Sequence, residues 1–180
     1  MEHNFPLQPY GRHLWTRENG SAIRAALEAV LDALPPGEVV VLDLEGVEVF
    51  DFSFANELFG RTLLHLPDDH PGRFVVVDHL NEYTRENLSQ ALASLGLLII
   101  ERKGGIYHLL GKVHPADEAT FAALVRTGRP VSAAELASAL GIQLTAMNER
   151  LAKLAQLAIV WRQKATSPAG REQYVYVVPT

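Results

Sequence analysis

Polar and cationic side chains gather near the C-terminus of this 180-residue chain. Gln143, Thr145 and Asn148 carry amide and hydroxyl groups, which can hydrogen-bond to the edges of DNA bases. The cations of this region, whose side chains suit phosphate groups, are Arg150, Lys153, Arg162, Lys164 and Arg171. Glu149 lies among them, and its carboxylate would repel phosphates unless it accepted a hydrogen bond from a cytosine amino group. These residue types predict a surface for double-stranded DNA, with a surface for a partner protein as the alternative.

Two expected helices position the polar side chains Gln143, Thr145 and Asn148. Ser132 is a favourable N-cap, Glu135 completes a capping box, and Gly141 stands where a left-handed C-cap ends the first helix. The second helix has apolar residues at spacings of three and four, namely Leu144, Met147, Leu151 and Leu154. That spacing leaves the polar residues on the outer face. Two short helices joined by a glycine-containing turn are typical of a helix-turn-helix, whose second helix can enter a major groove.

A hairpin is expected after the second helix. Residues 159–161 and 174–178 have the composition of strands, and residues 167–170 form a turn between them. A hairpin in this place resembles the wing of the winged helix-turn-helix family, with residues 117–127 as the first helix. The resemblance covers residue 115 onward and implies a complete DNA-binding or protein-binding module.

The front half of the chain alternates apolar strands with helices. Strands are expected at residues 38–44 and 74–78, and a hairpin at residues 97–101 and 106–110. Helices begin after Thr16, near residues 51–53, and after Asn81 or Thr84, whereas residues 67–72 read as a surface loop. This order predicts an α/β fold with a mainly parallel sheet and a final antiparallel hairpin. The expected domains are residues 1–111 and 112–180.

One segment of the front half, residues 40–64, carries a recognisable motif. The motif positions are Asp43, Gly46, Val47, Asp51 and Ser53. They resemble the STAS family (sulphate transporter and anti-sigma-factor antagonist), and more closely the STAS-like domains of bacterial regulatory proteins. Phe52 and Phe54 depart from the pattern, because they replace its first serine and its glycine. The resemblance covers residues 11–110 and implies a regulatory domain.

The same resemblance points to a regulatory site. In anti-sigma-factor antagonists a partner kinase phosphorylates the second serine of the motif, and Ser53 occupies that position. Free N–H groups at a helix start would stabilise a phosphate on Ser53, whereas Asp51 would repel it. Asp51 and Ser53 are therefore the candidate regulatory residues, with a regulatory protein or kinase as a partner. The alternative is that Ser53 only caps its helix, a role for which Asp51 is the other candidate.

Catalytic and metal chemistry find little support in the sequence. Asp43, Asp51, Asn56, Glu57 and Asp78 could gather at the strand ends where α/β sheets place ligands, but such side chains more often cap helices or face solvent. His65 and His70 flank an Asp-Asp pair in a polar segment that needs no metal. We therefore expect no catalytic residue, no metal, no cofactor and no enzyme activity.

Charge is divided unevenly along the chain. Residues 1–111 hold 8 Lys and Arg against 16 Asp and Glu, whereas residues 112–180 hold 8 against 5. A basic tail on an acidic front half suits a chain of which only the tail meets phosphates. The chain has no cysteine, signal peptide or long apolar run, so we expect a cytoplasmic protein without a membrane contact. A homodimer is expected, because one module with so few cations would bind DNA weakly.

The sequence thus predicts a bacterial transcriptional regulator whose STAS-like domain senses a signal or a protein partner. The alternative is a phosphorylation-switched protein-interaction module that resembles an anti-sigma-factor antagonist, with the C-terminal module used for protein contact.

Overall fold

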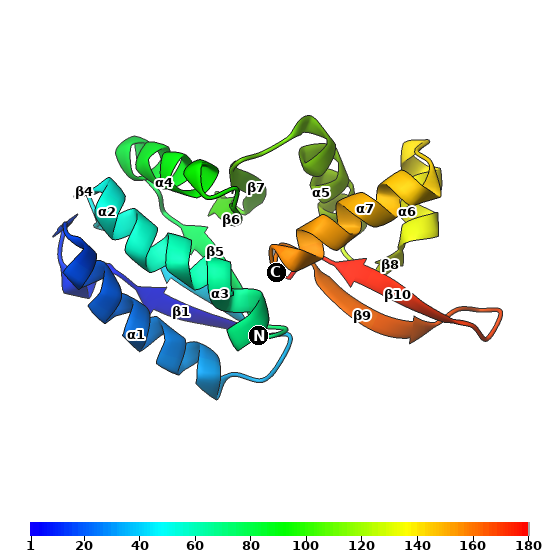
Figure 1. Ribbon diagram of the computed structural model, residues 1–180, viewed down its shortest axis with the longest axis horizontal. Coiled ribbons are helices and arrows are strands. Elements are labelled where there is room, and N and C mark those ends of the chain that lie inside the picture. The colour runs from blue at the N-terminus through cyan, green and yellow to red at the C-terminus, as the bar shows by residue number, and fades with distance from the viewer. Residues whose placement is uncertain (180) are drawn as a thin grey trace. The chain divides into compact units, whose positions relative to one another are not determined.

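The computed structural model describes residues 1–179, which divide into two compact units, residues 1–113 and residue 114 onward. Each unit has its own sheet and helices (Figure 1). Among the described residues, no helix is both long and apolar enough to traverse a lipid bilayer.

The first unit is built on a five-stranded sheet in the order β1-β3-β5-β6-β7. Its strands are β1 (Glu2–Pro6), β3 (Val39–Asp43), β5 (Phe74–Asp78), β6 (Leu98–Lys103) and β7 (Ile106–Gly111). All neighbours are parallel except β6 and β7, which confirms the predicted mainly parallel sheet with a final antiparallel hairpin. β1 was not predicted, because Phe5 is its one buried residue and this edge strand lacks a continuous apolar run. A second, short parallel pair joins β2 (His13–Leu14) to β4 (Val49–Phe50).

Three helical segments connect these strands. They are α1 (Arg17–Ala33), the continuous segment of α2 (Phe52–Ala55), the π-helix η2 (Asn56–Gly60) and α3 (Arg61–Asp69), and then α4 (Glu82–Ser94). The 3-10 turn η1 (Gln8–Tyr10) precedes β2. Right-handed connections that advance in one direction across a sheet place their helices on the same face. Accordingly α1 and α4 both pack against the middle segment (Figure 1).

The predicted surface loop at residues 67–72 is wrong in its first half. α3 continues through Pro67 to Asp69, and His70 beyond it is buried and lies 3.1 Å from the Asp32 carboxylate of α1. Leu66 is fully buried and anchors the last turn of α3 in the core. Packing of this residue therefore prevails over the local preference of proline, aspartate and glycine for a loop.

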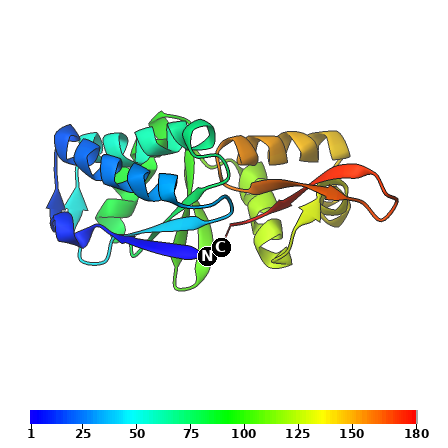
Figure 2. The same cartoon turned by 90° about the horizontal axis from the view of Figure 1, so that it is seen from below.

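The second unit combines three helices with a three-stranded antiparallel sheet in the order β8-β10-β9. Its elements are α5 (Pro115–Thr127), β8 (Val131–Ser132), α6 (Ala133–Leu140), α7 (Leu144–Gln156), β9 (Trp161–Thr166) and β10 (Glu172–Val177). Within this unit, the β9–β10 hairpin extends alongside α7 in both views (Figures 1 and 2). Met147, Leu151 and Leu154 of α7 are fully buried and form its core side.

The second unit confirms the predicted caps of its second helix, α6, but differs from other local predictions. Ser132 caps α6 by accepting a hydrogen bond from the Glu135 N–H, and Gly141 ends the helix in the left-handed region at φ 66°. The Glu135 carboxylate, however, pairs with Arg129. Leu144 was expected in the core but is half-exposed, because it stands at the first residue of α7. The predicted strand at residues 159–161 begins only at Trp161, since Ala158 turns the chain through a left-handed conformation.

Candidate functional site

The outer face of α7 carries the candidates for base contacts. Gln143 is the residue at the N-cap position, and Thr145 and Asn148 project from the first turns; all three are exposed. Glu149 is exposed on the same helix, and Arg150 is half-buried. Because the buried residues lie on the opposite side, the N-terminal half of α7 offers solvent an amide- and hydroxyl-bearing face with little positive charge.

Lys153 lies in a different environment from the other candidate cations. Its ammonium group donates a hydrogen bond to the Asp117 carboxylate of α5 at 2.5 Å, and the Asp117 side chain is only 4% exposed. A buried carboxylate needs a cation or several donors, so this pair joins α7 to α5. The sequence pattern placed Lys153 on the outer face, but it could not show that α5 lies beside it.

The hairpin carries the remaining cations. Arg162 and Lys164 are two residues apart on β9, so they project from the same face, and both are exposed. The Arg162 guanidinium lies 4.6 Å from the ring centroid of Tyr174 on β10, a cation–π contact that orients the side chain. Burial raises the pKa of neighbouring Tyr176 above its ordinary value. Sequence reasoning missed Tyr174, although an aromatic residue opposite cations in a hairpin was a visible signal.

Arg171 lies where the hairpin turn rejoins β10. The Gly170 N–H donates to the Ser167 carbonyl at 2.8 Å, and the Arg171 N–H donates to the Ser167 hydroxyl oxygen at 3.1 Å. These bonds confirm the predicted turn and leave the Arg171 side chain exposed.

The candidate regulatory residues lie where two helices begin. Asp51 caps α2, because its carboxylate accepts hydrogen bonds from the Phe54 N–H at 2.7 Å and from the Thr16 N–H at 3.3 Å. Of the two candidate caps, Asp51 is therefore confirmed and Ser53 is wrong. Ser53 is instead exposed in the first turn, beside the half-exposed ring of Phe52. Its hydroxyl group is accessible, which a modifying enzyme requires.

A buried carboxylate follows in the π-helix η2. Glu57 is 6% exposed at its side chain and lies among three arginines, Arg24 at 3.2 Å, Arg61 at 3.2 Å and Arg17 at 4.0 Å. Gly20 of α1 permits this approach, since a Cβ there would lie 3.0 Å from the Cβ of Glu57. π-Turns widen a helix locally, and here the turn directs Glu57 toward α1.

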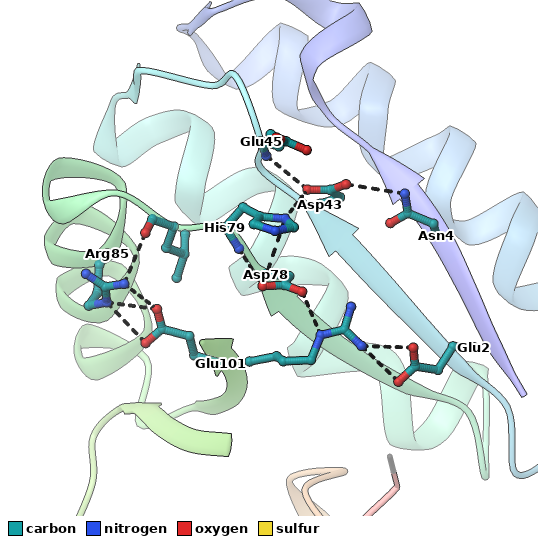
Figure 3. Close-up of polar contacts among 10 residues, drawn as sticks. Glu2, Asn4, Asp43, Glu45, Asp78, His79, Arg85 and Glu101 are labelled. Atoms are coloured by element: carbon teal, nitrogen blue, oxygen red, sulfur yellow. Dashed lines mark hydrogen bonds and ion pairs between the residues drawn. The ribbon is translucent and has the colours of Figure 1, made fainter. Parts of the chain in front are cut away.

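The strand ends of the sheet hold a polar network (Figure 3). The Asp43 carboxylate accepts hydrogen bonds from the Glu45 N–H at 3.0 Å and from Asn4 at 3.3 Å, and is joined to His79 at 2.8 Å. Burial would raise the pKa of Asp43, but these hydrogen bonds lower it below the ordinary value. The hydrogen bond to Asp43 is also the main reason why the pKa of His79 is raised.

Asp78 belongs to the same edge of the sheet. It accepts a hydrogen bond from Arg102 at 2.6 Å, and Arg102 also donates to Glu2 at 2.9 Å (Figure 3). The hydrogen bond to Asp78, followed by that to Glu2, raises the pKa of Arg102. The structure thus brings together Asp43 and Asp78, two of the five residues that could gather at the strand ends, whereas Asp51 caps α2.

Among the described residues, one group of three side chains has the spacing that a metal site requires. Potential ligand atoms of Asp43, Glu45 and His79 all lie within 4.8 Å of one another. His65 and His70, which the sequence analysis considered, are not part of this group. Asp43 and His79 of this group are joined to each other at 2.8 Å.

Comparison with known proteins identifies one segment of the chain. Residues 19–85 match the model of a STAS-like domain of unknown function (DUF4325), a span that contains Asp51 and Ser53. No curated protein matches the chain. A solved structure described as a possible transcriptional regulator from Methanosarcina mazei Go1 is similar at 17% identity and a TM-score of 0.36. The match covers 38% of this chain and 58% of that protein, so the chain spans a little over half of its length. The first unit therefore contains a STAS-like domain at residues 19–85.

Proposed function

We propose that this protein is a DNA-binding transcriptional regulator. In this proposal the STAS-like unit receives a signal or a protein partner, and the second unit is a winged helix-turn-helix domain that binds double-stranded DNA as part of a homodimer. The proposed role is not enzymatic, and it agrees with the strand-end carboxylates, because Asp43 and Asp78 have hydrogen-bond partners that satisfy them.

One observation carries the proposal: α7 exposes base-reading side chains beside a hairpin with exposed cations. Thr145 and Asn148 lie on the free face of α7, and Arg162 and Lys164 lie on one face of β9. The diameter of an α-helix fits the width of a major groove, and an adjacent cationic hairpin can reach the phosphate backbone. The division of labour follows, with α7 contacting bases and the hairpin contacting phosphates.

The charge of the unit sets the expected strength of binding. Lys153 is neutralised by Asp117, so Arg162, Lys164 and Arg171 are the main phosphate contacts in the proposal. Each neutralised phosphate adds about 0.9 to the slope of log affinity against log salt. Three contacts for each copy therefore give a modest affinity that two copies on adjacent half-sites would raise.

Selection of bound fragments from a random duplex library, at low and moderate salt, tests the proposal. We expect enrichment of a two-part site and loss of binding as the salt concentration rises. Charge reversal at Arg162 should abolish the gel shift of the selected duplex. Lys103→Glu is the matched control, because Lys103 is an exposed hairpin cation of the STAS-like unit and should leave the shift unchanged. Failure of the unmodified protein to bind any duplex would end this proposal.

A second candidate function rests on the exposure of Ser53. The chain could serve as a phosphorylation-switched protein-interaction module, with the second unit used for protein contact. Because Asp51 occupies the cap, a phosphate on Ser53 would add charge beside an existing carboxylate and change the surface around Phe52. Mass spectrometry of the Ser53 peptide after incubation with a cognate kinase tests this function, and an unmodified peptide argues against it.

A further inference from the structure

The five-stranded sheet ends in two unlike edge strands. β1 carries Glu2 near one end and Pro6 at the other, and charge and proline both discourage the addition of another strand. β7 has the sequence IYHLLG, with no lysine, arginine, acidic residue or proline. Ile106 is 62% exposed, and Tyr107 and Leu109 are partly exposed. An uncharged edge strand of this kind is open to pairing unless a partner covers it.

The register shows which backbone groups of β7 face outward. The Lys112 N–H donates to the Leu97 carbonyl at 3.1 Å, so these residues form a hydrogen-bonded pair that continues the β6–β7 ladder. Bonded and non-bonded pairs alternate along an antiparallel ladder, and every second residue of β7 therefore bonds to β6. Tyr107 and Leu109 lie between those residues, so their N–H and C=O groups point away from β6. Within residues 1–179, no strand pairs with this edge.

We propose that β7 is the interface of a homodimer, in which β7 of a second copy adds antiparallel to it and extends the sheet through both copies. Antiparallel pairing of a strand with its own copy is closed by a two-fold axis, which limits the assembly to two chains. In such pairing only residues near the two-fold axis meet their own equivalents, and the others face the opposite end of the partner strand. Because β7 contains no lysine, arginine or acidic residue, no register of this pairing sets like charges of these residues opposite one another.

The surface beside β7 shows which feature favours a second copy. Leu110 is partly exposed next to α4, where Glu82 and Glu86 are exposed and Arg85 is paired with Glu101. The uncharged strand itself, and not this acidic flank, therefore favours the pairing. The inference depends on the sheet of the first unit alone. It is therefore independent of whether the second unit binds DNA, and it is tested without DNA.

Sedimentation of the full chain over a wide range of protein concentration tests the interface. We expect a species of twice the 19.8 kDa chain mass. Leu109→Pro removes an outward N–H and keeps the bonds to β6, so the dimer loses two symmetry-related hydrogen bonds and its dissociation constant rises by roughly tenfold or more. The matched control is Asn4→Pro on β1. Leu7 donates to the Asp43 carbonyl, so the alternating ladder directs the Asn4 N–H outward, and this variant should remain a dimer.

Cysteine cross-linking provides a second, independent readout. The chain has no cysteine, so one cysteine placed in turn at Tyr107, His108 and Leu109 is unique in each variant. At least one of these positions lies close to the two-fold axis and should form a disulfide-linked dimer under mild oxidation, whereas Asn4→Cys should not. A wild-type chain that sediments as a monomer at every concentration overturns the proposal. So does a dimer that none of the three cysteines cross-links, and these positions decide the question if Leu109→Pro fails to fold.

Discussion

The ion pair between Lys153 and Asp117 gives the sharpest test of how the second unit is built. Lys153→Met keeps most of the aliphatic length of the side chain and removes the cation from an Asp117 carboxylate that is 4% exposed. A buried group that loses its partner costs about 1–3 kcal/mol, and because Lys153 itself is 42% exposed we expect about 2 kcal/mol. For a unit of this size that loss lowers the Tm by roughly 8–16 °C.

Thermal melting followed by circular dichroism measures this effect, and a double-mutant cycle assigns it. Asp117→Asn combined with Lys153→Met should recover about 1 kcal/mol of the loss, because no buried charge is then left without a partner. Lys164→Met is the matched control. Lys164 is exposed on β9, so its loss should change stability by no more than about 0.5 kcal/mol.

The same variants separate a structural lysine from a phosphate contact. On a selected duplex, Lys164→Met should reduce the salt slope by about 1, whereas Lys153→Met should leave it unchanged at a temperature where the variant is folded. The reasoning is refuted if Lys153→Met melts like the wild type and loses salt slope, since Lys153 would then contact phosphate and Asp117 would need no cation.

Three further predictions concern the first unit. The pKa of His79 is raised in the folded protein, so its bond to Asp43 contributes stability below about pH 6.5, and this contribution is lost as the pH rises through the folded-state pKa of His79. The pKa of Asp43 is lowered, so the contribution of the same bond is also lost in acid, where Asp43 becomes protonated. Urea titrations should therefore show that His79→Asn destabilises the protein more at pH 5.5 than at pH 8, and an equal loss at both values contradicts the assignment. Gly20→Val should cost about 1–3 kcal/mol in the same assay, because its Cβ would lie 3.0 Å from backbone and side-chain atoms of the facing helix, and an unchanged unfolding midpoint would show that α1 can move aside. Arg85→Met leaves the buried Glu101 carboxylate without its cation and should cost about 3–5 kcal/mol, whereas a loss below 1 kcal/mol would mean that Glu101 is satisfied otherwise.

Much of the local structure was readable from the sequence. The strands β3 and β5 are continuous apolar runs, and both proved to be central strands of a mainly parallel sheet. Thr16, Ser132 and Gly141 cap helices as their residue types predicted. The motif that contains Asp51 lies within the STAS-like segment at residues 19–85. Signals of this kind depend on neighbours a few positions apart, which is why one sequence reveals them.

Other features depended on distant parts of the chain. β1 pairs with β3 through backbone groups, so its own side chains gave no signal. α3 continues through Pro67, because the buried Leu66 holds its last turn in the core. Ser53 is exposed and is not a cap, because the Asp51 carboxylate accepts hydrogen bonds from backbone N–H groups at the starts of both α1 and α2.

The sequence by itself determined the order of helices and strands, the caps that begin and end several of them, and the side of α7 that faces the core. Tertiary structure decided which charged groups remain available to a partner. Lys153 and Arg162 are both cations beside polar neighbours in the sequence, yet one is neutralised by Asp117 and the other stays exposed over Tyr174. The reason is that periodicity fixes the direction of a side chain from its own helix or strand, whereas its electrostatic environment is set by residues that folding brings from elsewhere in the chain.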